Sequence, residues 1–376
     1  MDDLTPHFSA WRTLQSGNRE ITDAIVRDGS RGPTPALARA LEGWGGAWYW
    51  ADPGETRLIL VRAVGGKSPR WWLHIGLLIL TLICTMGAGA VLNGAWAPVT
   101  GSTLLSQMVA ATRYFSDVAT GDWQLLLSGW SFAVPLLAIL LVHELGHYLT
   151  ARRYAIDVTP PFFIPVPPSL SPVGSLGAFI RLRSPVLDRR QLLDVGAAGP
   201  LAGFAMAVLV LAWGYSISER IPIVVGADPS YVTLAGNPVF LGESLLTGWL
   251  RDLVLPGTAA VHLSPPAFAG WVGMLLTGLN LVPLSQLDGG HIAYGLLGRG
   301  QRWVAWVAVA GLLYMAQAAP GWYAWLGLAF LVGGGRVTHP PVIIGSGTLP
   351  ASRRLVGLAC LALLAICLMP RPFGEV

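Results

Sequence analysis

Long apolar runs are the feature that most restricts what this chain can fold into. Apolar residues make up 53% of the sequence and charged residues only 12%, about half the share in a soluble domain. A helix needs about 20 apolar residues to cross a bilayer. Seven stretches are candidate spans: 72–92, 125–149, 194–217, 266–284, 303–319, 321–334 and 355–369. The sequence therefore predicts an all-α polytopic membrane protein with six or seven transmembrane helices, since the short stretch at 321–334 either crosses, re-enters or pairs with 303–319.

Three regions follow from this pattern. Residues 1–70 are polar and are expected to form a small N-terminal cytoplasmic region. Within it, AWYWAD and TRLILVRAV flank Pro53-Gly54 and indicate two strands joined by a turn. Residues 71–300 are expected to form the transmembrane core, and 301–376 to add C-terminal transmembrane helices. The N-terminus lacks the apolar stretch of a cleavable signal peptide, so none is expected.

The distribution of positive charge predicts the orientation in the membrane. Alternation through seven spans from a cytoplasmic N-terminus leaves 20 of the 24 Lys and Arg residues on the cytoplasmic side. The other four are Arg113, Arg220, Arg251 and Arg371. Cytoplasmic segments carry such an excess, so we expect a multi-pass membrane protein whose N-terminus and active site lie toward the cytoplasm. The membrane that we expect is that of a bacterial cell. The net charge of +4 is too small to indicate nucleic-acid binding.

Two stretches between the spans have patterns of their own. Prolines in 160–185 exclude a helix there, and SLGAFIRLR (175–183) alternates like a strand. We expect a β-hairpin that dips toward the membrane, sheltered by protein or by a water-filled cavity. Residues 237–256 carry apolar residues at helical spacing and predict an amphipathic helix on the outer face.

Three ionisable residues interrupt the second candidate span, in LLVHELGHYL (140–149). His143 and His147 lie one helical turn apart on one face, so both ring nitrogens can bind one ion. Glu144 can reach a metal-bound water as a general base without binding the metal. This H-E-x-x-H spacing is that of a zinc hydrolase. Charged groups deep in a span cost about 2.5–3.5 kcal/mol each, which disfavours a merely structural role.

A catalytic zinc ion usually has three protein ligands and one bound water. Asp194, Asp288 and His291 are the candidates for the third ligand. Asp194 opens the third span and can equally cap that helix. His291 is a rival that is expected nearer to water.

Asp288 lies in GLNLVPLSQLDGGHI (278–292), after a long apolar run. Pro283 ends the helix, and the Gly-Gly pair after the aspartate lets the backbone turn sharply. An aspartate at such a break can direct its carboxylate sideways into a bundle. The expected topology also places Asp288 at the same depth as His147, which favours pairing the two segments.

Several motifs together resemble a known family. The chain contains HELGH (143–147), FFIPVP (162–167), GSLGAF (174–179), GAAGPLAG (196–203), AGWVGMLLTGLNLVP (269–283) and NLVPLSQLDGG (280–290). These stretches resemble the site-2 protease family of intramembrane zinc metalloproteases, and most closely the branch shared by bacteria and plastids. The resemblance covers most of residues 125–300.

The resemblance implies a metal site and two catalytic residues. One Zn²⁺ per chain would be bound by His143, His147 and Asp288, with Glu144 as the general base. Asn280 matches the asparagine of the NxxPxxxLDG motif and is implied to hold the substrate backbone or to stabilise the oxyanion. An amide inside an apolar run also needs a hydrogen-bond partner, which an interhelical contact would supply equally well.

Four further residues carry expectations. Gly174 and Gly177 would let an extended substrate approach the 174–183 strand and pair with its edge. Some family members have an asparagine where Gly203 stands, which puts a polar role at that position in doubt. His339 is expected to be a solvated loop histidine.

Together these patterns predict an intramembrane zinc metalloprotease that cuts peptide bonds within or near transmembrane segments of membrane proteins and releases a cytoplasmic fragment. The expected partners are a transmembrane protein substrate and the lipid bilayer, with no nucleic acid. The sequence does not set the oligomeric state. Two alternatives stay open. A membrane-anchored zinc peptidase acting on soluble chains would share the metal residues, and a metal transporter or binding protein would not need Glu144.

Overall fold

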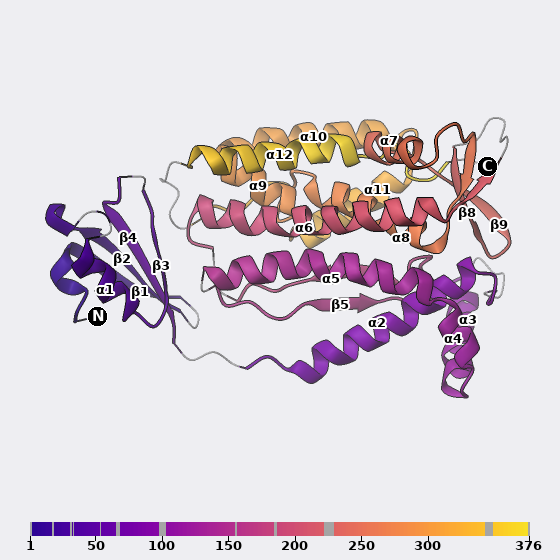
Figure 1. Cartoon of the computed structure of the whole chain (residues 1–376), viewed down its shortest axis with the longest axis horizontal. Coiled ribbons are helices and arrows are strands. Elements are labelled where there is room, and N and C mark those ends of the chain that lie inside the picture. Colours follow the sequence, from indigo (N-terminus) through magenta and orange to yellow (C-terminus); the bar gives the residue numbers. More distant parts are fainter. Residues whose placement is uncertain are drawn as a thin grey trace.

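The structure is a computed structural model of the chain. It describes residues 2–16, 19–30, 32, 34–52, 54–64, 68–97, 103–154, 156–183, 186–221, 229–342 and 349–374. Figure 1 shows a small domain of strands at one end of an elongated bundle of helices, which run roughly parallel to its long axis.

The N-terminal domain is a four-stranded antiparallel sheet with one helix packed on it. Its elements are β1 (Phe8–Ser16), β2 (Arg19–Val26), α1 (Pro35–Glu42), β3 (Ala47–Trp50) and β4 (Arg57–Ala63), in the strand order β1-β2-β4-β3. Leu37 and Leu41 of α1 are buried against Leu58 and Leu60 of the sheet. The two predicted strands are confirmed, since β3 pairs with β4. Pro53, between them, lies outside the described residues.

The rest of the chain is mainly helical. By length and composition, α2 (Trp71–Leu92), α5 (Trp130–Arg153) and α6 (Arg189–Ser216) can cross a membrane. The other helices are shorter: α3 (Leu104–Ala119), α4 (Trp123–Ser128), α7 (Leu245–Val254), α8 (Pro265–Leu281), α9 (Asp288–Leu297), α10 (Gln301–Ala316), α11 (Gly321–Val332) and α12 (Ala351–Cys367). Each predicted span therefore overlaps a helix, and the span predicted over 125–149 begins in α4 and continues into α5. Three of the described helices meet the length and hydropathy of a span, so the helical membrane fold is confirmed but not the number of six or seven transmembrane helices.

Small residues bring α5, α6 and α8 close together. A Cβ atom on Gly146 of α5 would lie 2.5 Å from the carbonyl oxygen of Ala198 in α6. One on Gly270 of α8 would lie 2.6 Å from the backbone of Leu211, also in α6. Glycine at such contacts lets helix backbones approach closely, as in other membrane bundles. These contacts place the neighbouring faces of α5 and α6 side by side.

The proline-rich stretch after α5 forms the expected hairpin. β5 (Phe162–Pro165) pairs antiparallel with β6 (Ser175–Phe179). The hairpin runs along α5, as Figure 1 shows for β5. The strand predicted over 175–183 ends at Phe179, and beyond it an isolated bridge joins Val158 to Leu182.

A second small sheet lies at the opposite end of the bundle from the N-terminal domain (Figure 1). It contains β7 (Glu219–Ile221), β8 (Ser230–Leu234), β9 (Asn237–Leu241) and β10 (Ala260–His262), in the order β7-β10-β8-β9. The helix predicted over 237–256 is wrong for its first part, because residues 237–241 pair with β8 as a hairpin. α7 begins only after Ser244, which forms a capping box with Thr247.

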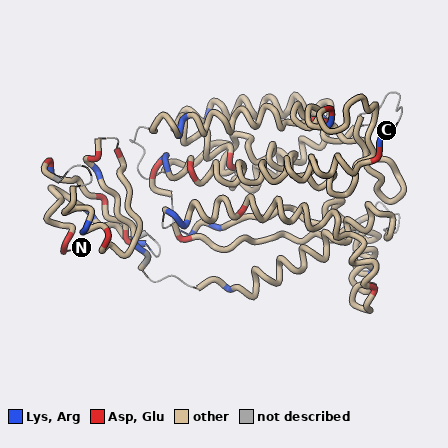
Figure 2. The backbone as a smooth tube through the Cα atoms, viewed as in Figure 1, with Lys and Arg blue, Asp and Glu red and all other residues tan. Residues whose placement is uncertain are grey.

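The second face of the N-terminal sheet rests on the end of the bundle. Ile21 and Ile59 pack with Leu187, which precedes α6. The buried guanidinium group of Arg19 donates to the carbonyl oxygen of Tyr154, just beyond α5, at 3.2 Å. Figure 2 shows that charged residues gather in this domain and near the ends of the helices, while most of the bundle has none.

Candidate metal centre

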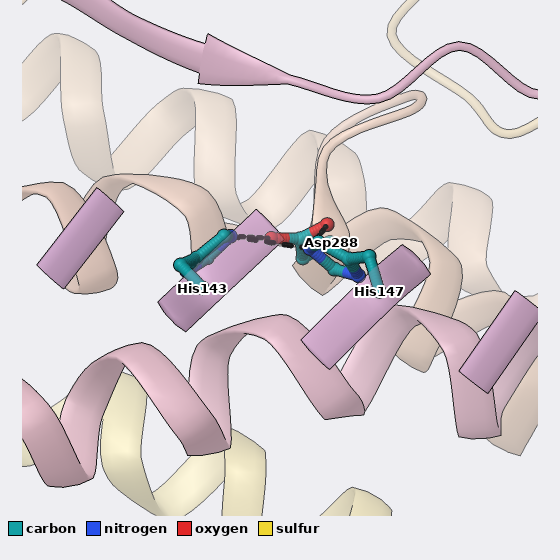
Figure 3. A group of neighbouring side chains, drawn as sticks. All are labelled: His143, His147 and Asp288. Carbon is teal, nitrogen blue, oxygen red and sulfur yellow. Dashed lines mark hydrogen bonds and ion pairs between the residues drawn. The ribbon is translucent and has the colours of Figure 1, made fainter. Parts of the chain in front are cut away.

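Three side chains from two helices meet inside the bundle (Figure 3). His143 and His147 project from α5 one turn apart, and Asp288 is the first residue of α9. His143 Nε2 lies 3.3 Å from Asp288 Oδ2, and His147 Nε2 lies 3.2 Å from Asp288 Oδ1. The two Nε2 atoms are 3.1 Å apart. Among the described residues, this group has the donor atoms and spacing to hold a metal ion.

The spacing of the three residues fits a tetrahedral ion. Bonds of about 2.0–2.1 Å to a central zinc ion place neighbouring ligand atoms roughly 3.3 Å apart. The two Nε2 atoms are 3.1 Å apart, and each lies 3.2–3.3 Å from a different oxygen of the Asp288 carboxylate. With both imidazoles neutral and their Nε2 atoms unprotonated, two nitrogen lone pairs and the Asp288 carboxylate, all buried, face one another. A cation at their centre relieves that repulsion and compensates for the buried carboxylate.

The hydrogen bonds of His147 prepare its Nε2 atom for a metal. Its Nδ1 atom lies 2.7 Å from the carbonyl oxygen of Val195, near the start of α6. A carbonyl oxygen can only accept, so Nδ1 carries the proton and Nε2 keeps its lone pair. Such a bond fixes the tautomer and the ring orientation of a metal-binding histidine. α6 therefore orients a side chain of α5.

Two glycines of α6 make room for the imidazole rings. A Cβ atom on Gly199 would lie 2.0 Å from His147 Nε2. One on Gly203 would lie 2.9 Å from His143 Nδ1. Some members of the family that this sequence resembles carry an asparagine at the position of Gly203. In this chain its missing side chain lets His143 pack against α6.

The turn between α8 and α9 directs Asp288 into the bundle. We call residues 282–287 the carboxylate turn. Within it, Ser285 has a φ of 41°, a left-handed conformation that residues other than glycine rarely adopt. A Cβ on Gly289 would lie 1.9 Å from the carbonyl oxygen of Leu281, at the end of α8, and one on Gly290 would lie 2.2 Å from that of Ser285 in the turn. The break and the glycine pair read from the sequence therefore do position this carboxylate.

A cavity of about 710 Å³ opens beside the three donor atoms. It lies between α5, α8, α11 and β6, and most of its walls are apolar. Glu144 lines it with a side chain that is 5% exposed, and the main-chain N–H of Ile180 lies near its carboxylate. Glu144 lies outside the group of donor atoms that could share a metal. Its carboxylate thus faces the cavity beside the candidate metal position.

Asn280 lines the same cavity from the last turn of α8. Its Nδ2 atom lies 3.4 Å from His143 Nε2. The amide is therefore adjacent to a donor atom of the candidate centre, within reach of a group bound there.

The two glycines expected to face a substrate lie in different surroundings. Gly177, with a φ of 102°, lines the cavity, and a Cβ there would meet nothing within 4 Å. Gly174, with a φ of 75°, packs on α2, where a Cβ would lie 2.5 Å from the carbonyl oxygen of Cys84. The missing side chain of Gly174 therefore accommodates a helix, and the substrate role expected of this residue stays a prediction.

The other candidates for the third ligand have different partners. Asp194 forms an ion pair with Arg353 of α12 at 2.9 Å and accepts a hydrogen bond from the Tyr154 hydroxyl. This ion pair joins α6 to α12 and takes Asp194 out of the candidate centre. His291, one turn after Asp288 on α9, contacts His339 through Nδ1 and Nε2 atoms 2.8 Å apart.

His339 is not the solvated loop histidine that the sequence predicted. The segment after α11 folds back over α9, so the His339 ring is half-buried and lies 4.7 Å from the ring of Tyr294. No local pattern in the sequence predicts that the chain folds back here.

The main-chain N–H of Ile180 and the carbonyl oxygen of Val195 were also not predicted from the sequence. Every residue type other than proline carries the same main-chain groups, so the sequence does not mark the ones that contact a site.

Comparisons with known proteins agree with this site. Residues 131–317 match the model of peptidase family M50. The chain is 34% identical over 208 residues to "Probable zinc metalloprotease EGY2, chloroplastic" of Arabidopsis thaliana, covering 55% of this chain and 35% of that protein. It is 32% identical over 261 residues to "Probable zinc metalloprotease EGY1, chloroplastic" of the same plant, covering 66% of this chain and 42% of that protein. The chain thus spans less than half the length of these curated relatives. No solved structure matches it significantly.

Gly199→Ala is expected to weaken metal binding, because the added Cβ would lie 2.0 Å from His147 Nε2 and must displace the ring. We expect the zinc affinity of the full-length protein in detergent, measured by competition with a chromophoric chelator, to fall roughly 10–100-fold. Gly311→Ala on α10 is the matched control, since a Cβ there meets nothing within 4 Å. Equal zinc affinities for Gly199→Ala and the wild type would contradict the close contact between α6 and His147.

Proposed function

Because the chain belongs to peptidase family M50, the family of the site-2 proteases, we propose that it is a zinc metalloprotease that hydrolyses peptide bonds within or near transmembrane segments of membrane proteins. One observation carries this proposal. The Nε2 atoms of His143 and His147 lie 3.1 Å apart, each 3.2–3.3 Å from one carboxylate oxygen of Asp288, beside an apolar cavity that Glu144 also lines. This arrangement combines a candidate zinc site, a general base and room for an apolar substrate.

His143, His147 and Asp288 would hold the zinc ion, which supplies Lewis-acid activation of the scissile carbonyl and acidifies the attacking water. Glu144 accepts a proton from that water as its oxygen bonds to the carbonyl carbon. It then delivers the proton to the amide nitrogen as the carbon–nitrogen bond breaks.

Asn280 is the residue we assign to the developing negative charge. Its amide lies next to His143 Nε2 and lines the cavity. An amide N–H donor placed there can stabilise the carbonyl oxygen of the substrate as charge builds on it. The strength of such a contact grows in a cavity with little water.

The edge of β6 is the surface that we propose for the substrate backbone. β5 occupies one edge of β6, and residues 175–180 line the cavity. The N–H of Ile180 lies near the Glu144 carboxylate. Because main-chain groups alternate between the two edges of a strand, the N–H of Ala178 is expected on the same open edge. An unwound substrate segment adding as a strand there would pass beside Glu144.

We also propose the orientation that the charge distribution favours. Twenty of 24 Lys and Arg residues lie on the side of the N-terminal domain in that topology, which would be the cytoplasmic side of a bacterial cell membrane. The relatives named above are chloroplastic, so the bacterial membrane rests on the sequence alone. In this orientation water enters the cavity from the side of the N-terminal domain.

Glu144→Gln is expected to keep zinc and lose proteolysis, because the amide cannot accept the proton of the attacking water. We expect turnover to fall roughly 10²–10⁴-fold, the usual contribution of a general base, with one zinc per chain retained. Quantitative membrane proteomics of cells producing either form should find single-span proteins that accumulate with the variant. Zinc uptake that persists in this variant, with no protein ever cut by the wild type, would favour the transport alternative instead.

Ala178→Pro is expected to slow cleavage, because proline removes the N–H that would pair with an extended substrate. Ala178→Val is the matched control, since it keeps that N–H and favours a strand. Turnover of a tagged single-span reporter should fall at least about tenfold with proline and stay near wild type with valine. Proline substitutions at successive positions from 176 to 182 that all leave turnover unchanged would remove the strand-addition model.

The product is expected on the side of the N-terminal domain. A single-span reporter with a different tag at each end, cleaved in intact cells, should release its cytoplasmic tag as a soluble fragment. Recovery of the freed fragment only from the opposite side would overturn the proposed orientation without affecting the assignment of the metal centre.

A further inference from the structure

Three hydrogen bonds from outside reach the carboxylate turn that precedes Asp288. The N–H of Ser285 donates to the carbonyl oxygen of Val337 at 2.7 Å, and its hydroxyl lies 3.4 Å from the carbonyl oxygen of Gly333. The side-chain amide of Gln301 donates to the carbonyl oxygen of Pro283 at 3.0 Å. These partners come from the start of α10 and from the segment after α11. We call residues 333–340 the supporting segment.

Gln301 joins the carboxylate turn to the supporting segment. Its side chain is 1% exposed, and both ends of its amide are used. Nε2 donates to Pro283, and Oε1 accepts from the main-chain N–H of His339 at 3.0 Å. A buried polar group left without its partner is strongly unfavourable. An apolar side chain at position 301 would therefore leave the carbonyl oxygen of Pro283 and the main-chain N–H of His339 without these hydrogen bonds.

His339 ties the supporting segment to α9. Its Nδ1 atom contacts the carbonyl oxygen of Pro340, which can only accept, so Nδ1 carries the proton. Its Nε2 atom is then the acceptor for His291 Nδ1–H at 2.8 Å. His291 follows Asp288 by one turn, and Ser285 precedes it by three residues. The supporting segment is thus anchored on both sides of Asp288.

We propose that Gln301 and His339 are positioning residues that hold Asp288 at the separation from the two imidazoles that a metal ion requires. This inference rests on the proposed zinc site. Asp288 is the one member of the candidate centre that does not come from α5, so its place depends on how α9 begins. That start has no side-chain cap, and the turn before it contains the left-handed Ser285. The turn therefore depends on support from neighbouring segments.

The supporting segment lies outside the part of the chain that matches the family. The match ends at residue 317, which includes Gln301 but not His339. The C-terminal helices would therefore do more than add to the membrane-embedded surface. Through residues 333–340 they would also help to hold Asp288, a metal ligand of the core, in position.

The test compares zinc affinity in full-length Gln301→Met and His339→Leu variants, using the apoprotein, added zinc alone and a competing chelator. Each substitution is expected to weaken zinc binding roughly 10–100-fold, as loss of support around a ligand does. His339→Gln, whose side-chain oxygen can accept from His291, should restore affinity to within a few-fold of wild type. In the double variant, the fold decrease in zinc affinity should be smaller than the product of the two single decreases. Both substitutions disrupt the same connection between the supporting segment and Asp288.

Tyr114→Phe is the matched control. It also removes a buried side-chain hydrogen bond to a main-chain carbonyl, that of Ile83 at 2.7 Å, at a site between α3 and α2 away from the candidate centre. Its zinc affinity should equal that of wild type. If thermal unfolding of the apoprotein shows that Gln301→Met does not fold, the zinc affinity of His339→Leu tests the inference. A wild type that binds no zinc would defeat the proposed function, whereas wild-type affinity in folded variants would overturn this inference alone.

Discussion

The rest of the structure depends on two imidazole nitrogens and one carboxylate held 3.1–3.3 Å from one another inside an apolar bundle. A carboxylate facing two imidazole lone pairs in such surroundings is unfavourable unless a cation lies between them. The neighbouring helices accommodate this arrangement at specific positions. Gly199 and Gly203 give the rings their space, and the Val195 carbonyl fixes the tautomer of one of them. The packing of α6 on α5 is therefore inseparable from the geometry of the centre.

The division of roles among the elements explains why the fold combines long helices with irregular chain. α5 supplies two donors and the general base at helical spacing, which needs no special backbone. The third donor must come from another direction, and a broken helix provides it. The hairpin of β5 and β6 adds an extended edge, and the N–H of Ile180 just beyond it lies near Glu144. Non-helical backbone at membrane depth requires shelter, and this hairpin lines a cavity and packs on protein.

Much of the candidate site could be read from the sequence because its signals are local. The pair His143 and His147 needs only the period of a helix, and the chain break at Asp288 is marked by proline and glycine. Matching these two segments required the expected topology and the family resemblance. The hairpin was predictable from its prolines, and the N-terminal strand pair from its turn.

Features that depend on tertiary contacts could not be read in this way. Gly174 resembles Gly177 in sequence and in its left-handed backbone, yet it faces α2 rather than the cavity. The helix predicted over 237–256 gave way to a strand, because pairing with β8 outweighs local periodicity. His339 has loop-like neighbours and is nevertheless packed on α9. The number of membrane crossings also depends on how short helices sit in the bilayer, which spacing along the sequence does not determine.

The central claim is one zinc ion held by two imidazoles and one carboxylate from separate helices. Elemental analysis combined with zinc X-ray absorption spectroscopy, on full-length protein purified without chelators, tests it most directly. The account predicts one zinc per chain, with two imidazole nitrogens at about 2.0–2.1 Å and carboxylate oxygen at about 2.0–2.2 Å, and loss of that oxygen contribution in Asp288→Ala. Protein without zinc, or a ligand set that is unchanged in Asp288→Ala, would contradict it.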